Sequence, residues 1–73
     1  MNLQEVQSKT REIIVGILGY EPVGTYILSK DEMRSFLERA QENFGFSPFL
    51  PDNVRLSEMA DKINEQIQAR LEP

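Results

Sequence analysis

A capping-box pattern at Ser29 is the feature that most constrains what this chain can fold into. Glu32 follows three residues later, so the Ser29 hydroxyl can accept from a backbone N–H in the first helical turn, while the Glu32 carboxylate reaches back to the amide of Ser29. Apolar side chains then recur at helical spacing, at Met33, Phe36, Leu37, Ala40 and Phe44. Gly45 ends this pattern. The stretch predicts an amphipathic helix from about Lys30 to Asn43.

Two further segments have helical periodicity. The first runs from about Leu3 to Leu18, and Gly19 suits the left-handed residue that ends many helices. The second runs from about Glu58 to Leu71, with an earlier start as the alternative, and Ser57 is its predicted N-cap. Gly16 interrupts the first segment, where it weakens the helix by about 1 kcal/mol relative to alanine. We expect Gly16 to allow close packing against another backbone.

The two connectors between these helices are too apolar to be free linkers. We expect residues 19–28 to form a loop that lies across the helices and fills core space, with a short strand as the alternative. In residues 45–53, we expect Phe46, Phe49 and Leu50 to close the bottom of the core, with a place in an interface as the alternative for these three side chains. Pro51 begins a turn or a short helix, since proline suits the first helical position.

The apolar stripes of three amphipathic helices cannot be buried separately, so they share one core. We therefore predict an all-α fold, a small antiparallel bundle of three to four helices, with residues 1–73 as a single domain. The predicted core consists of Ile14, Ile17, Phe36, Leu37, Ala40, Ile63 and Ile67.

The composition argues against several classes of function. The chain has 73 residues with no cysteine and no histidine, so it lacks a thiolate nucleophile, the usual general base and the usual zinc ligand. A net charge of −4 disfavours nucleic acids and anionic membrane surfaces as partners. There is no apolar run long enough to span a membrane and no signal-peptide pattern. We expect a cytoplasmic monomer that is not an enzyme.

Acidic pairs at two predicted helix starts are the remaining candidates for chemistry. Asp31 and Glu32 form one pair, and Glu58 and Asp61 form the other. Acidic residues are favoured at helix N-termini by the helix dipole, which explains both pairs without a site. Neither pair has the spacing of a calcium-binding loop. We therefore predict no catalytic residues and no metal site.

The second half of the chain resembles an acyl or peptidyl carrier protein. In that family an amphipathic helix ends in a Phe-Gly-apolar stop, followed by a Pro-Asp turn and a capped helix with an apolar stripe. The residues in those places here are Phe44-Gly45-Phe46, Pro51-Asp52, Ser57, Met59-Ala60 and Ile63. The first helix and its long apolar connector also fit, so the resemblance covers most of the chain and implies a carrier-like bundle.

The resemblance implies a prosthetic group at Ser29. The family attaches phosphopantetheine to the serine of an Asp-Ser-Leu motif at the start of the second helix, and Ser29 lies close to the matching place. Here Leu28 stands where the acid would be and Lys30 where the leucine would be. The alternative is that Ser29 only caps the helix.

The function implied by the resemblance is that of a carrier module. It would hold an acyl or aminoacyl thioester on a phosphopantetheine arm at Ser29 for partner enzymes, as in fatty acid or polyketide biosynthesis. Basic-surfaced partners would be steered by acids on the second helix. The candidate contacts are Asp31, Glu32, Glu38 and Glu42. The alternative function is a small helical interaction or regulatory domain with no prosthetic group.

Overall fold

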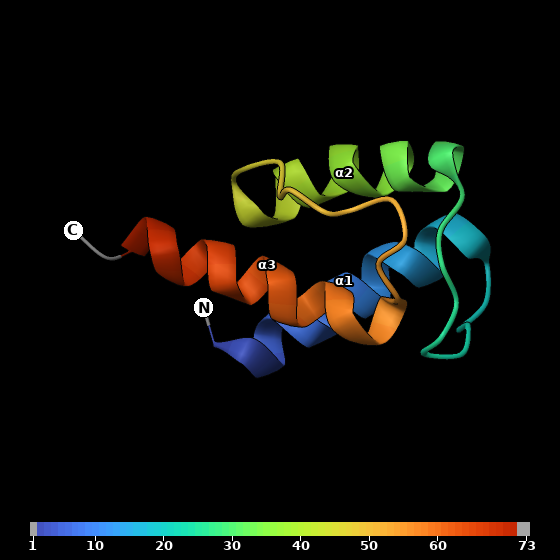
Figure 1. Cartoon of the computed structure of the whole chain (residues 1–73), viewed down its shortest axis with the longest axis horizontal. Coiled ribbons are helices and arrows are strands. Elements are labelled where there is room, and N and C mark those ends of the chain that lie inside the picture. Colours follow the sequence, from blue (N-terminus) through green and yellow to red (C-terminus); the bar gives the residue numbers. More distant parts are fainter. Residues whose placement is uncertain (1, 72–73) are drawn as a thin grey trace.

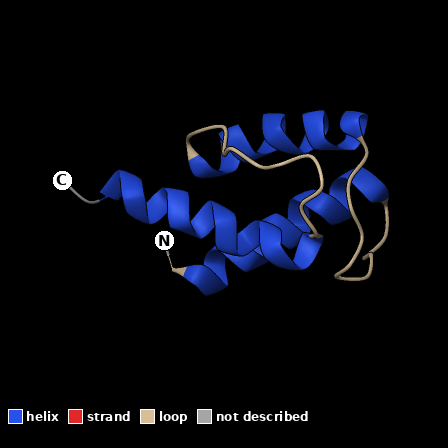
Figure 2. Cartoon of the chain, in the orientation of Figure 1, coloured by secondary structure: helices blue, strands red, loops and turns tan. Residues whose placement is uncertain are grey.

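The computed structural model describes residues 2–71 and shows an all-helical chain within that range (Figures 1 and 2). Its helices are α1 (Leu3–Leu18), α2 (Lys30–Phe44) and α3 (Leu56–Leu71). The predicted all-α class and the three predicted helices are confirmed. Between α2 and α3 the described chain forms a turn at residues 52–53 and no fourth helix.

The ends of α1 and α2 follow the capping residues seen in the sequence. Asn2 caps α1 by accepting from the backbone N–H of Glu5 at 2.9 Å. Gly19 and Gly45 end α1 and α2 in the left-handed conformation, with φ of 80° and 83°. Glycine adopts this conformation without the steric penalty of a Cβ atom, so both predicted helix stops are confirmed.

The start of α3 differs from the prediction. The helix begins at Leu56, so Ser57 lies within its first turn and is not the N-cap. The N–H groups of Leu56 and Ser57 donate instead to the carbonyls of Tyr26 and Gly24, at 3.1 and 3.0 Å. The free N–H groups at a helix start need acceptors. Here the connector between α1 and α2 provides them, which ties this connector to α3.

Helix α1 is the central element of the fold. It packs against both α2 and α3, whereas the backbones of α2 and α3 make no close approach within the described residues. In Figure 1, α2 lies apart from α3, and the segment from Gly45 to Arg55 crosses between them. Phe46, Leu50 and Val54 of this segment are buried, so the loop supplies core side chains between the two helices.

The core is one cluster drawn from all three helices and both connectors. Of the predicted core residues, five are buried, whereas Ile17 and Leu37 are only partly buried. Phe49 was expected in the core and is 79% exposed, so that prediction is wrong. Met1, Glu72 and Pro73, at the limits of the predicted domain 1–73, lie outside the described residues. The buried residues are Val6, Thr10, Ile13, Ile14, Leu28, Met33, Phe36, Ala40, Phe46, Pro48, Leu50, Val54, Met59, Ala60, Ile63 and Ile67.

The connector from Gly19 to Leu28 fills core space only in part. Leu28 is buried and Tyr26 is partly buried, but Val23 and Ile27 are 70% and 45% exposed. The segment does not become a strand. Ile27 forms only an isolated antiparallel bridge with Arg55, a pairing that the sequence did not reveal.

Gly16 does not face another backbone as expected. A Cβ atom at Gly16 would lie 2.9 Å from Nη1 of Arg39, so its close neighbour is the tip of a side chain from α2.

No helix within residues 2–71 is long and apolar enough to cross a lipid bilayer.

Candidate functional site

Ser29 occupies an exposed position at the start of α2. Its Oγ accepts from the backbone N–H of Glu32 at 3.3 Å, and its own N–H donates to Oε1 of Glu32 at 2.8 Å. The predicted capping box is therefore confirmed. In the cap, the serine hydroxyl acts as an acceptor, which leaves its O–H free to donate to another group. The arrangement presents a solvent-facing hydroxyl on a fixed backbone.

Tyr26 is a member of this cluster that the sequence pattern did not reveal. Its hydroxyl donates to both carboxylate oxygens of Glu32, at 2.9 and 3.1 Å. The N–H of Ser29, followed by the Tyr26 hydroxyl, lowers the pKa of Glu32 because both donors stabilise the carboxylate. The bond to Glu32 raises the pKa of Tyr26 in turn. The ionised carboxylate thus joins the connector to the first turn of α2.

The two sequence neighbours of Ser29 differ in solvent exposure. Leu28 is buried in the core with 4% of its surface exposed, whereas Lys30 is exposed. The extended backbone at Ser29, with φ −68° and ψ 170°, carries the chain from the core to the outer surface. Leu28 is therefore a core side chain, and Lys30 begins the exposed surface of α2.

Three of the four acidic candidates on α2 are free to meet a partner. Asp31, Glu38 and Glu42 are exposed, and the one ion pair among residues 2–71 lies elsewhere, between α1 and the first connector. Glu32 differs, because it is half-buried and its carboxylate is bound to Ser29 and Tyr26. We call the three exposed candidates, Asp31, Glu38 and Glu42, the acidic face.

A groove of about 370 Å³ begins one residue after Ser29. It lies between α2 and the loop that follows α2. Met33 and Leu37 give it apolar lining, and Lys30 and Arg34 add positive charge one helical turn apart. The remaining lining residues are Glu38, Gln41, Ser47 and Asp52. The groove therefore combines apolar surface with two basic and two acidic side chains.

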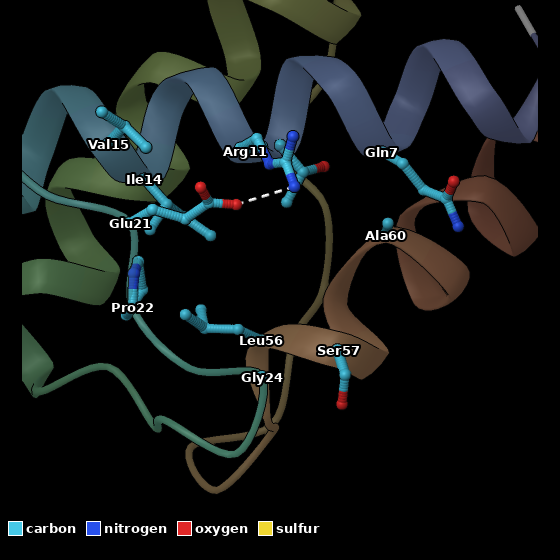
Figure 3. Close-up of a pocket in the computed structure, with 11 residues that line it drawn as sticks. Gln7, Arg11, Ile14, Val15, Glu21, Pro22, Gly24, Leu56, Ser57 and Ala60 are labelled. Atoms are coloured by element: carbon cyan, nitrogen blue, oxygen red, sulfur yellow. Dashed lines mark ion pairs between the residues drawn. The ribbon is translucent and has the colours of Figure 1, made fainter.

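A second cavity, of about 340 Å³, lies between α1, the first connector and the start of α3 (Figure 3). Arg11 and Glu21 form an ion pair of 2.7 Å at this cavity, and both side chains are largely exposed. Ile14 and Leu56 contribute apolar lining. Thr10 also lines it, with a buried hydroxyl that has no hydrogen-bond partner among the described residues. None of the predicted site residues borders this cavity.

Comparison with known proteins gives no match: no family model, no curated protein and no solved structure is significantly similar to the chain. Within residues 2–71 there is also no cluster of acidic side chains that could hold a metal ion.

Proposed function

We propose that the chain is a carrier-like module that holds an acyl or aminoacyl group on a phosphopantetheine arm attached to Ser29. The observation that carries the proposal is the exposed Ser29 hydroxyl, fixed at the start of α2 by the capping box. The proposed architecture is a carrier-like antiparallel bundle in which the second helix begins at the attachment site. In this role the chain has no catalytic residue of its own and acts with cytoplasmic biosynthetic enzymes.

The residues beside Ser29 fit such a group. Its phosphate would be attached through Ser29 Oγ, and Lys30 and Arg34 offer positive charge along the adjacent groove. Met33 and Leu37 offer apolar surface for the rest of the arm. When bound, the arm supplies a thiol that carries the acyl group as a thioester. Glu32 has a positioning role, because its carboxylate fixes the backbone of Ser29.

The acidic face extends along the same helix from the attachment site. Asp31 is two residues from Ser29, and Glu38 and Glu42 follow along α2 with exposed side chains. Such charges accelerate encounter with a basic surface and help to orient it. We propose that this face recruits basic-surfaced partner enzymes to the arm.

The intact mass of the protein tests the attachment. The chain is incubated with coenzyme A and a broad-specificity phosphopantetheinyl transferase, beside an established carrier protein as positive control. We expect the mass to rise by one phosphopantetheine, and we expect Ser29→Ala to remain unchanged. If the control carrier is modified while this chain keeps its mass, attachment at Ser29 is ruled out.

A helical interaction or regulatory domain without a prosthetic group is the second candidate. The specific observation in its favour is that Ser29, Leu28 and Lys30 each have a local structural role as cap, core and surface residues. Under this function the acidic face would bind its partner whether or not Ser29 is modified. Failure of the mass experiment together with salt-sensitive partner binding would support this candidate.

A further inference from the structure

We propose that Phe49 anchors a second docking surface, which binds a partner protein through an apolar pocket rimmed by carboxylates. Phe49 lies in the loop between α2 and α3 and is 79% exposed, the largest exposure of any large apolar side chain among the described residues. Its neighbours Pro48 and Leu50 are both buried. The chain on each side is therefore fixed to the core, while the phenyl ring projects into solvent.

Gln66 of α3 holds the backbone of Phe49 from both sides. The Phe49 N–H donates to Gln66 Oε1 at 2.7 Å, and Gln66 Nε2 donates to the Phe49 carbonyl at 2.7 Å. Gln66 Nε2 also donates to the carbonyl of Lys62 at 3.3 Å. The backbone of Phe49 is thus bonded on both sides, and the two flanking side chains, Pro48 and Leu50, are buried. The exposure of Phe49 is thus built into the loop.

A fixed, exposed aromatic ring has the properties of an interface anchor. Aromatic side chains carry a large share of binding energy when they fill a pocket on the partner. A loop that is already held in its bound conformation loses less entropy on association. The paired bonds from Gln66 give Phe49 this advantage. Val23 provides a contrast, since it is 70% exposed in a connector position where no side chain clamps its backbone among the described residues.

The charges near Phe49 identify the chemistry of the partner. Lys62, Gln66 and Arg70 are spaced four residues apart and share one stripe of α3. The Arg70 guanidinium lies 4.1 Å from the centre of the Phe46 ring, which anchors its position beside the loop. Glu58 begins the same row one turn before Lys62, whereas Asp61 and Glu65 lie on the neighbouring row. Lys62 and Arg70 lie one turn on either side of Gln66, and we call these two residues the basic stripe. Two positive charges beside the Phe49 loop favour a partner with carboxylates around its pocket.

This surface is independent of the proposed carrier function. It does not use Ser29, and its basic stripe selects the opposite charge from the acidic face of α2. Failure of one proposal would therefore leave the other standing.

Photo-crosslinking identifies the partner and begins the test. Benzoylphenylalanine is introduced in place of Phe49 in the full chain, within cells that naturally contain it, and in place of Val23 as a matched control. We expect a discrete crosslinked protein at position 49 that is absent at position 23. Absence of a product specific to position 49 would overturn the proposal.

The recovered protein is then purified and its Kd for the unmodified chain is measured. We expect Phe49→Ala to raise Kd at least about tenfold, with the thermal midpoint of the chain unchanged. Lys62→Glu should also raise Kd, by a factor that shrinks as salt increases. Gln66→Leu should raise Kd and speed hydrogen exchange at the Phe49 amide, while Val23→Ala should leave Kd unchanged. A Kd that is insensitive to Phe49→Ala, or that improves with Lys62→Glu, would overturn the proposal.

Discussion

The hydroxyl of Tyr26 and the carboxylate of Glu32 form a bifurcated hydrogen bond, with oxygen–oxygen distances of 2.9 and 3.1 Å. The same carboxylate accepts from the Ser29 N–H at 2.8 Å, so it links the end of the first connector to the first turn of α2. A negative charge at this point also interacts favourably with the helix dipole. The ionised state of Glu32 therefore helps to fix the backbone that presents Ser29.

This linkage predicts a specific pH dependence of stability. The pKa of Glu32 in the folded chain is lowered below its ordinary value of 4.5. Its contribution is therefore complete above that value and is lost as the pH falls through the folded pKa. We expect Glu32→Gln to lower the thermal midpoint at neutral pH, and the difference from wild type to shrink as the pH drops below 4.5. Thermal unfolding followed by circular dichroism across this range measures the difference.

Glu38→Gln is the matched control for the pH experiment. Glu38 is exposed on the same helix and its carboxylate has no hydrogen bond or ion pair among the described residues. We expect its substitution to leave the pH dependence of the midpoint nearly unchanged. A Glu32→Gln difference that stays constant with pH would contradict the role of the ionised carboxylate.

Truncation of Phe36 tests the core. Phe36 is fully buried, at 0% exposure, within the cluster that joins all three helices. We expect Phe36→Ala to cost about 3–5 kcal/mol, because the substitution removes apolar contacts and leaves a cavity. Relative to total stabilities of about 5–15 kcal/mol, this loss would shift the urea midpoint strongly. Leu37→Ala, at a partly buried position, should cost less, and equal costs would contradict the observed orientation of α2.

The helices could be predicted because their signals are local. The apolar spacing of α2, the box at Ser29 and the stop at Gly45 involve neighbours within one or two turns, and the structure confirms each of them. The start of α3 could not be predicted in the same way. Its first N–H groups donate to Tyr26 and Gly24, which are remote in sequence, so a local cap at Ser57 was unnecessary.

Local sequence signals also predict the loop side chains only in part. Apolar composition predicts burial, and it does so correctly for Phe46 and Leu50. Phe49 has the same composition signal but is exposed, in a loop position where Gln66 of α3 binds its backbone N–H and carbonyl. Residues 19–28 were expected only to fill core space, whereas the Tyr26 hydroxyl donates to the Glu32 carboxylate that also binds the Ser29 N–H. Such pairings depend on the tertiary fold, which periodicity does not encode.

Alanine substitutions at Gly16 and Gly45 should change stability in opposite directions. Gly16 lies within α1, where alanine is favoured by about 1 kcal/mol. The only close contact of the added Cβ is the flexible tip of the exposed Arg39 side chain, which can move aside. Gly45 has φ of 83°, where a Cβ atom costs about 1–2 kcal/mol. We expect Gly16→Ala to raise the urea midpoint and Gly45→Ala to lower it, and a loss of stability in both would show that Arg39 cannot move.

Reversal of charge on the acidic face tests the proposed recruitment of a basic partner. Glu38 and Glu42 are exposed on α2, so replacing both with lysine should alter the electrostatic field without disturbing the core. We expect slower association with a basic partner, measured by stopped-flow fluorescence, and a smaller penalty at high salt because screening acts over about 8 Å at physiological ionic strength. Gln41→Lys is the control for added positive charge on the same helix. Association rates that are insensitive to both the reversal and the salt would remove this face from the proposal.

Substitution of Ser29 by two different residues separates its role in folding from its role in attachment. As an N-cap, Ser29→Ala should cost about 0.5–2 kcal/mol, and Ser29→Asp should recover most of that loss because aspartate caps as well as serine. As an attachment site, both substitutions should abolish loading, because neither provides a hydroxyl oxygen for the phosphate ester. Urea unfolding measures the first effect and intact mass after the transferase reaction measures the second. A Ser29→Asp chain that is folded and retains full function in the cell would exclude attachment and favour the interaction domain, whereas a folded chain that has lost function would identify the hydroxyl as the required group.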